Sequence, residues 1–157
     1  MVEQGEQAPP FCLPNQAGEG VCLHDIASWL VLYFYPKDGS SGCTREAKDF
    51  SALRGEFDTL GVRVLGMSPD TPAKHRSFIE KEGLALELLS DETPDHGVLR
   101  AYGVWQKKQM YGREYEGVVR TTVVIGPDGV VRHVWGKVKV PGHAEAVLSF
   151  MRELVAG

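Results

Sequence analysis

The sequence predicts an α/β fold with a central mixed β-sheet flanked by helices, and three observations support it. Continuous apolar runs of strand length alternate with segments whose apolar residues recur at helical spacing. The last third of the chain adds an antiparallel hairpin and a closing helix. The 157 residues, 43% hydrophobic and 24% charged, match the size and composition of one globular domain. We therefore expect a single domain over residues 1–157, without repeats or linkers.

The N-terminal part of the chain predicts a β-hairpin and then a buried strand. Two short apolar runs, 11–13 and 21–23, flank the loop Pro-Asn-Gln-Ala-Gly-Glu-Gly, which is the pattern of a hairpin with a long loop. The run 29–35 (Trp-Leu-Val-Leu-Tyr-Phe-Tyr) is apolar and aromatic without polar alternation. Such a run is typical of a strand covered on both faces. We expect the hairpin at an edge and this strand in the centre of the sheet.

A loop and a helix follow the central strand. Pro36 ends the strand, and the loop Lys-Asp-Gly-Ser-Ser-Gly leads to Cys43. Between positions 47 and 60 apolar residues recur at helical spacing, so Cys43 is expected in the first turn of a helix. Free backbone N–H groups and the positive end of the helix dipole favour an anion there. A thiolate is such an anion, so the position predicts a reactive cysteine.

The remainder of the chain continues the alternation of strands and helices. The expected elements are, in order, strand 62–67, helix 72–82, strand 86–89, helix 94–102, a polar and aromatic loop 104–115, strand 118–125, strand 130–135 and helix 142–155. The turn Gly-Pro-Asp-Gly joins the last two strands as a hairpin. This order fits a thioredoxin-like arrangement.

The charge pattern excludes several classes of partner. Seventeen Lys and Arg against 21 Asp and Glu give a net charge of −4, and the basic residues are scattered singly. A nucleic-acid binder would show a basic patch, so no nucleic-acid partner is expected. The chain has neither an apolar stretch of about 18 residues nor a basic N-terminal segment before an apolar run. We expect no membrane contact and a cytoplasmic location.

The cysteines and histidines give little support to a metal site. Cys12, Cys22 and Cys43 form no Cys-x-x-Cys pair, and their odd number is unlike a secreted disulfide framework. This count suits one reactive thiol in a reducing compartment. The histidines lack ligand spacing, so no metal is expected; they are His24, His75, His96, His133 and His143.

The segment 33–50 closely resembles the active-site motif of peroxiredoxins, in particular the Q-type branch, also called bacterioferritin comigratory protein. It reads Tyr-Phe-Tyr-Pro-Lys-Asp-Gly-Ser-Ser-Gly-Cys-Thr-Arg-Glu-Ala-Lys-Asp-Phe. Other blocks resemble the family in order and spacing across essentially the whole chain: VRVLGMSPD at 62–70, LLSD at 88–91, YGVW at 102–105 and the strand at 119–125 with its Asp-Gly turn. The resemblance implies a thioredoxin-like fold of peroxiredoxin type.

The resemblance also implies a thiol peroxidase that reduces hydrogen peroxide and organic hydroperoxides without a cofactor. Cys43 would be the peroxidatic nucleophile that becomes a sulfenic acid, and Pro36 would shield its sulfur. Ser40, where the family usually has Thr, would hydrogen-bond thiolate and peroxide. Arg120 matches the active-site arginine that holds both groups. Glu46, one helical turn after the cysteine, is expected to orient this arginine, with a plain solvated charge as the alternative.

No second cysteine stands where the family often carries a resolving partner. Five residues after Cys43 the chain has Lys48, and the predicted helix 72–82 contains no cysteine. We therefore expect a one-cysteine mechanism in which an external thiol reduces the sulfenic acid. This reductant would be thioredoxin, glutaredoxin or a low-molecular-weight thiol, and the enzyme would be a monomer or weak homodimer.

The N-terminal hairpin leaves the state of its two cysteines open. Pairing the runs 11–13 and 21–23 sets Cys12 opposite Cys22, at a separation close to what a disulfide needs. We expect ordinary cysteines in an edge hairpin. The alternatives are a Cys12–Cys22 disulfide and resolution of Cys43 by either residue.

Two other functions compete with the peroxidase. A thioredoxin-type thiol–disulfide oxidoreductase is disfavoured, because Ser40 stands three residues before Cys43 and leaves a single thiol. A non-catalytic module with the same fold is disfavoured by the retained Pro36, Ser40, Cys43 and Arg120. The aromatic and Met side chains of the loop 104–115 are expected to pack locally, with a pocket rim or a dimer contact as the alternative.

Overall fold

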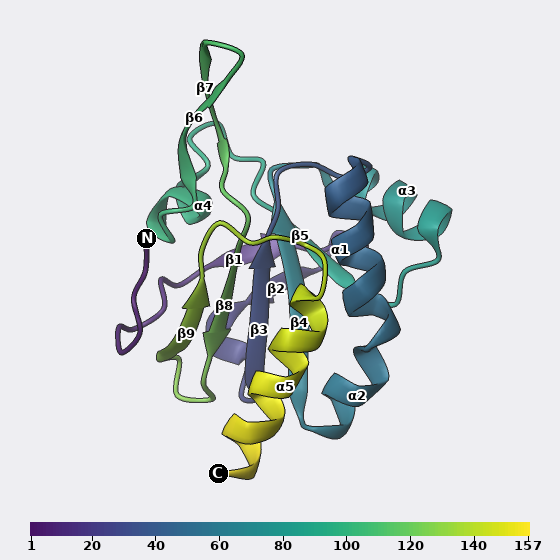
Figure 1. The fold of residues 1–157 in the computed structure, drawn as a ribbon, viewed down its shortest axis with the longest axis vertical. Coiled ribbons are helices and arrows are strands. Elements are labelled where there is room, and N and C mark those ends of the chain that lie inside the picture. The colour runs from purple at the N-terminus through teal and green to yellow at the C-terminus, as the bar shows by residue number, and fades with distance from the viewer.

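A computed structural model describes all 157 residues, and its centre is a five-stranded mixed sheet in the order β5-β4-β3-β8-β9 (Figure 1). The strands are β3 (Trp29–Phe34), β4 (Val62–Ser68), β5 (Glu87–Ser90), β8 (Thr121–Ile125) and β9 (Val131–Trp135). β3 runs parallel to β4 and antiparallel to β8, so it is the central strand that its apolar run predicts. The α/β fold with a mixed sheet is confirmed.

Helices cover one face of the sheet more fully than the other. Four helices supply buried side chains to the core on one face: α1 (Ser41–Ala52), α2 (Arg54–Thr59), α3 (Pro72–Glu82) and α5 (His143–Ala156). The opposite face is covered by the N-terminal segment, by the short helix α4 (Gly97–Ala101) and by a small hairpin. None of these helices combines the length and the apolar composition that a membrane-spanning helix requires.

Two hairpins lie outside the main sheet. The first, β1 (Cys12–Pro14) with β2 (Gly20–Cys22), precedes the 3-10 turn η1 (Leu23–Asp25) and is the predicted N-terminal hairpin. The second, β6 (Trp105–Met110) with β7 (Arg113–Val118), projects from the body of the molecule (Figure 1).

The β6–β7 hairpin corrects the prediction of a loop over 104–115. Most of its residues are exposed or only half-buried, so the strands lack the apolar alternation that a buried face imposes. Its turn has positive φ at both central residues, 53° at Tyr111 and 76° at Gly112. That is the conformation of a tight two-residue hairpin turn, in which glycine is favoured.

Two predicted elements are interrupted in the structure. The helical pattern after Cys43 divides into α1 and α2 at Leu53. The predicted strand 118–125 divides into β7 and β8, with Val119 and Arg120 between them. This second break matters because it takes Arg120 out of the sheet ladder.

The structure overturns the expectation of ordinary cysteines in the N-terminal hairpin. The predicted pairing of Cys12 with Cys22 is confirmed, and their Cα atoms are 4.0 Å apart. The two sulfurs are bonded at 2.10 Å, which leaves Cys43 as the one free cysteine. The disulfide that remained an alternative at the level of the sequence is therefore present.

Candidate active site

The site lies where three strand ends meet. The end of β3 pairs with the start of β8, Phe34 opposite Thr121, because these strands are antiparallel. The parallel neighbour β4 ends at the same edge, with Met67 beside Phe34. The loop to α1 follows β3, and Arg120 immediately precedes β8. Strand order therefore brings Cys43 and Arg120 together although 77 residues separate them.

Cys43 lies in the first turn of α1, as the sequence predicts. The helix begins at Ser41, its N-cap is Ser40, and no side chain caps it. The backbone N–H groups of this turn therefore have no side-chain acceptor. They lie at the positive end of the helix dipole, where an anion is favoured. The side chain of Cys43 is only 1% exposed.

Arg120 joins Cys43 to Glu46. Its Nη2 group donates to Cys43 Sγ at 3.3 Å, and its Nη1 group donates to Glu46 Oε1 at 2.7 Å. Glu46 is 1% exposed and lies one helical turn after the cysteine, so it is not a solvated surface charge. The backbone carbonyl of Arg120 accepts from Val138 N at 2.9 Å, which anchors the residue between the two strands.

Gly42 makes this close approach possible. A Cβ atom at position 42 would lie 3.2 Å from Arg120 Nη2, which is tighter than an ordinary van der Waals contact. The absence of a side chain therefore lets the guanidinium reach the sulfur over the first turn of α1. No sequence pattern marks this glycine, because its role depends on an arginine distant in the chain.

The buried charges at the site shift one another's pKa values. Burial raises the pKa of Glu46 from its ordinary 4.5 to about 7, although the charge and hydrogen bond of Arg120 lower it. The Oε2 atom of Glu46 has no hydrogen-bond partner, which adds to the penalty for the charged form. Burial lowers the pKa of Arg120, but Cys43 and Glu46 more than offset this, and the net direction is upward. The guanidinium therefore stays charged.

A buried histidine lies close enough to the arginine to feel its charge. His143, the first residue of α5, contacts Thr122 Oγ1 through Nε2 at 2.8 Å. Burial, helped by the charge of Arg120, lowers the pKa of His143 to about 4. Near neutral pH the imidazole is therefore uncharged and does not compete with Arg120 for the anionic groups.

The other two predicted residues, Ser40 and Pro36, do not take part in the hydrogen bonds that join Cys43, Arg120 and Glu46. The Ser40 hydroxyl is exposed and donates to the Lys37 carbonyl at 3.3 Å rather than to the sulfur. Pro36 follows β3 and is half-buried at the start of the loop. Both residues belong to the loop that positions Cys43, but neither bonds to its side chain.

A buried network that the sequence analysis missed holds this loop. Asp38 accepts from Tyr35 Oη at 2.6 Å, and its second oxygen lies 2.7 Å from His75 Nδ1. The other ring nitrogen, Nε2, lies 3.0 Å from the Leu89 carbonyl and must donate to it. A proton therefore lies between Nδ1 and the Asp38 carboxylate as well. His75 is fully buried, so this pair ties the loop to α3.

Asp70 strengthens the same connection. Its Oδ2 atom accepts from the backbone N–H of Asp38 at 2.8 Å and from the Ser68 hydroxyl at 2.8 Å. Asp70 comes from the Ser-Pro-Asp segment that ends β4, and His75 lies in the first turn of α3. A polar segment after a buried strand was the available signal, but no sequence spacing relates it to the loop.

Comparison with known proteins agrees with this geometry. The sequence pattern of the AhpC/TSA family matches residues 4–134. Peroxiredoxin Bcp of Xanthomonas campestris is 47% identical over 124 residues, covering 79% of this chain and 76% of that protein.

Solved structures extend the similarity to the fold. The bacterioferritin comigratory protein of Xanthomonas campestris, which has alkyl peroxide reduction activity, is 41% identical with a TM-score of 0.85, over 92% of both chains. A cysteine-to-serine mutant of the Xylella fastidiosa peroxiredoxin Q is 35% identical with a TM-score of 0.91. This second match covers 98% of this chain and 97% of that one.

Proposed function

The chain belongs to the AhpC/TSA family of thiol-dependent peroxidases, and we propose that Cys43 is its peroxidatic nucleophile. One observation carries the assignment: Arg120 Nη2 lies 3.3 Å from the Cys43 sulfur, at the start of a helix that no side chain caps. We also propose that residues 1–157 form a single catalytic domain.

The reaction is a displacement at oxygen. The Cys43 thiolate attacks one peroxide oxygen, an S–O bond forms and the O–O bond breaks. The sulfur becomes a sulfenic acid, and the other oxygen leaves as water or as an alcohol after it takes a proton. Negative charge passes from sulfur to the leaving oxygen. Arg120 can donate to both atoms, since a guanidinium presents several N–H groups in one plane.

Charge stabilisation is the main contribution of Arg120 in this proposal. A thiol gains little in rate from being ionised more completely, because intrinsic nucleophilicity falls as its pKa falls. Alignment of the O–O bond and stabilisation of the leaving oxygen must therefore supply most of the acceleration. The Glu46 carboxylate is a positioning group here, because it holds Nη1 and so aims Nη2 at the sulfur. Pro36 and the Ser40 hydroxyl would border the peroxide.

The sulfenic acid is reduced by an external thiol. Lys48 occupies the position five residues after Cys43, and its exposed ammonium pairs with the half-buried Glu82 at 3.2 Å. The other two cysteines are bonded to each other. Support for a one-cysteine mechanism thus comes from the lack of a partner thiol beside Cys43.

We propose hydrogen peroxide and organic hydroperoxides as substrates. The alkyl peroxide reduction activity of the similar Xanthomonas protein supports the second class. The predicted reductant is thioredoxin, glutaredoxin or a low-molecular-weight thiol. A monomeric or weakly dimeric state and a cytoplasmic location stay predictions as well.

Trapping of the oxidised sulfur tests this proposal. Wild type and Cys43→Ser are treated with one equivalent of peroxide and a sulfenic-acid reagent, and analysed by non-reducing mass spectrometry. We expect the adduct on Cys43 in wild type, no adduct in the variant, and dithiothreitol-coupled peroxide consumption only in wild type. An internal disulfide that includes Cys43 would refute the one-cysteine mechanism, and turnover by Cys43→Ser would refute the assignment of the nucleophile.

A further inference from the structure

The Cys12–Cys22 disulfide lies apart from the peroxidase site. Leu13 and Val21 of its hairpin belong to the core on one face of the main sheet, whereas Cys43 belongs to the core on the other. A disulfide requires Cα atoms within about 7 Å, and packed layers on a sheet lie about 10 Å from it. Within one chain of this fold, neither hairpin cysteine can therefore bond to Cys43.

The disulfide faces solvent, because successive side chains of the two short strands point to opposite sides. Leu13 and Val21 point into the core and are buried, so their neighbours Cys12 and Cys22 point outward. Cys12 is exposed and Cys22 is half-buried. Exposed disulfides are the ones that exchange readily with thiols, because an attacking thiolate can reach the sulfur.

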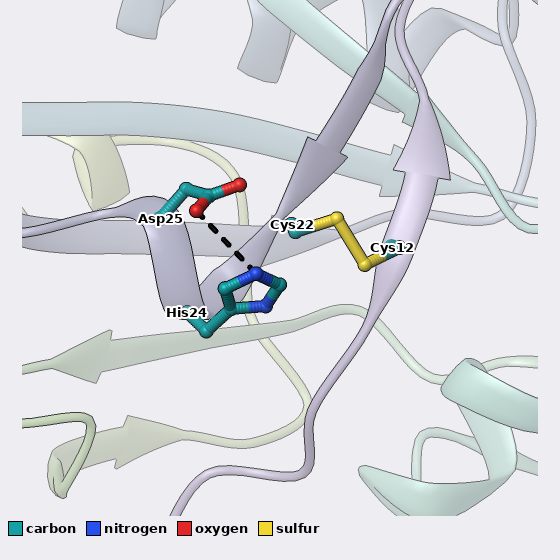
Figure 2. The surroundings of a disulfide bond; sticks show 4 residues. All are labelled: Cys12, Cys22, His24 and Asp25. Atoms are coloured by element: carbon teal, nitrogen blue, oxygen red, sulfur yellow. Dashed lines mark ion pairs between the residues drawn. A yellow bond between two sulfur atoms is a disulfide. The ribbon is translucent and has the colours of Figure 1, made fainter.

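An imidazole stands beside the disulfide. Figure 2 shows His24, in the turn that directly follows β2, next to the two bonded sulfurs. One of its ring nitrogens and both sulfurs lie within 4.8 Å of one another. The Nε2 atom of His24 lies 3.4 Å from Asp25 Oδ1, and both side chains are largely exposed. The hairpin thus places a reducible disulfide next to an imidazole that can transfer protons.

We propose that Cys12–Cys22 is a second redox site of this protein, a disulfide that a dithiol reduces by thiol–disulfide exchange. A thiolate of the dithiol attacks the exposed sulfur of Cys12, forming a mixed disulfide and releasing Cys22 as a thiolate. The second thiol of the dithiol then attacks its own bonded sulfur and releases Cys12. The dithiol loses two electrons and two protons, and the hairpin gains two thiols. The reverse steps restore the disulfide with an oxidised dithiol.

His24 assists the first step as a proton donor. The leaving Cys22 thiolate needs a proton, and a ring nitrogen of His24 lies within 4.8 Å of both sulfurs. Asp25 holds this ring through its contact with Nε2. Attack at Cys12 is favoured because its side chain is the more exposed of the two.

The test uses Cys43→Ser, so that peroxide chemistry at the other site does not contribute. Folded protein is equilibrated in mixtures of reduced and oxidised dithiothreitol, free thiols are alkylated with iodoacetamide, and the mass is measured. We expect one reversible transition between a species with no added groups and a species with two. Cys12→Ser in the same background is the control and should show no such two-electron transition.

Two results would overturn this proposal. In one, the bond resists reduction until urea unfolds the chain, which would make it a structural crosslink only. In the other, the reduced hairpin fails to close in oxidised dithiothreitol. Either result would leave the assignment of Cys43 untouched, because that residue is absent from the test protein.

A histidine variant tests the acid–base role separately. His24→Asn in the Cys43→Ser background should slow reduction by dithiothreitol about tenfold, less than the usual 10²- to 10⁴-fold contribution of general acid catalysis because the group is exposed. Asp25→Asn keeps the imidazole, so its rate of reduction by dithiothreitol should fall by less than that of His24→Asn. An unchanged rate in His24→Asn would remove His24 from the mechanism.

Discussion

At the scale of single residues, the chemistry depends on the two donors of one guanidinium. Nη1 of Arg120 is held by Glu46 at 2.7 Å, and Nη2 reaches the Cys43 sulfur at 3.3 Å. A lysine could make only one of these contacts with comparable geometry, because its ammonium is a point charge on a flexible stem. The arginine therefore both fixes its own orientation and carries the charge.

Arg120→Ala should slow sulfenic-acid formation by about 10²- to 10³-fold, the range seen when one charge-stabilising donor is removed. The thiolate fraction, followed by ultraviolet absorbance, should change too little to account for this loss. Arg152→Ala, which removes an exposed ion pair with Glu56, is the matched control and should keep the rate. A loss explained by the thiolate fraction alone would contradict the role of Arg120 at the leaving oxygen.

Gly42→Ala tests whether the close approach of Arg120 matters. The added methyl group would lie 3.2 Å from Nη2, so the guanidinium must move by a few tenths of an ångström. We expect a rate loss of up to about tenfold, since small misplacements at a reacting centre are costly. Stability should not fall, because alanine favours a helix over glycine by about 1 kcal/mol.

Gly55→Ala in α2 is the control for this glycine. A Cβ atom there meets nothing within 4 Å, so only the helix-forming preference changes. Its rate should equal that of wild type, and its stability should rise or stay the same. Equal rates in both variants would show that the site tolerates the displaced guanidinium.

At the scale of elements, the loop before α1 is held by its neighbours rather than by its own sequence. It contains glycine and serine and is bordered by Pro36, and no side chain caps the helix that follows. Its fixed shape comes from the pair Asp38–His75 and from Asp70, which tie it to α3 and to the end of β4. The position of Cys43 thus depends on a buried network one layer away.

His75→Asn should lower the free energy of unfolding by about 1–3 kcal/mol, the usual cost of leaving a buried hydrogen-bonding group without its partner. Sulfenic-acid formation should also slow, because the loop before Cys43 loses its tie to α3. Denaturant unfolding and single-turnover rates measure the two effects. Ser77→Ala, an exposed change on the same helix, should alter neither. A stability loss with an unchanged rate would show that the network does not position the nucleophile.

At the scale of the whole molecule, two buried groups give opposite pH dependences. The folded state holds the proton of Glu46 up to about pH 7, against 4.5 ordinarily, so this group's stabilisation is present below pH 4.5 and is lost as pH rises through 7. His143 has its pKa lowered from 6.5 to about 4, so its stabilisation is present above pH 6.5 and is lost as pH falls through 4. The Glu46 shift corresponds to about 3 kcal/mol, and the contribution of the less deeply buried His143 is smaller because solvent screens it.

These two contributions oppose each other between pH 4.5 and 6.5, and single variants should separate them. Relative to wild type, Glu46→Gln should gain stability as pH rises from about 4.5 to 7, since it lacks the carboxylate that becomes destabilising. His143→Gln should lose stability relative to wild type as pH rises from about 4 to 6.5, since it lacks the imidazole that becomes stabilising there. Urea unfolding at several pH values measures both. Two variants whose pH profiles run parallel to wild type would contradict the shifted pKa values.

Much of the fold could be predicted because periodic apolar patterns report local conformation. The helix expected over 72–82 has the bounds of α3, and the apolar run after the first hairpin is the central strand β3. The β6–β7 hairpin was not predicted, because its strands carry no such apolar pattern. Only Trp105 and Val118, where the hairpin joins the body, pack against the core, so no apolar alternation marks the rest of the two strands.

The sequence by itself determined that Cys43 lies in the first turn of a helix after a buried strand, and the pairing of two short apolar runs set Cys12 opposite Cys22. Tertiary structure alone decided that these two cysteines are bonded, that Glu46 is buried against Arg120, and that His75 holds the active-site loop. The physical reason is that local patterns specify backbone conformation and the face on which a side chain lies. Neighbours across the sheet depend on strand order and burial, which bring together residues far apart in the chain.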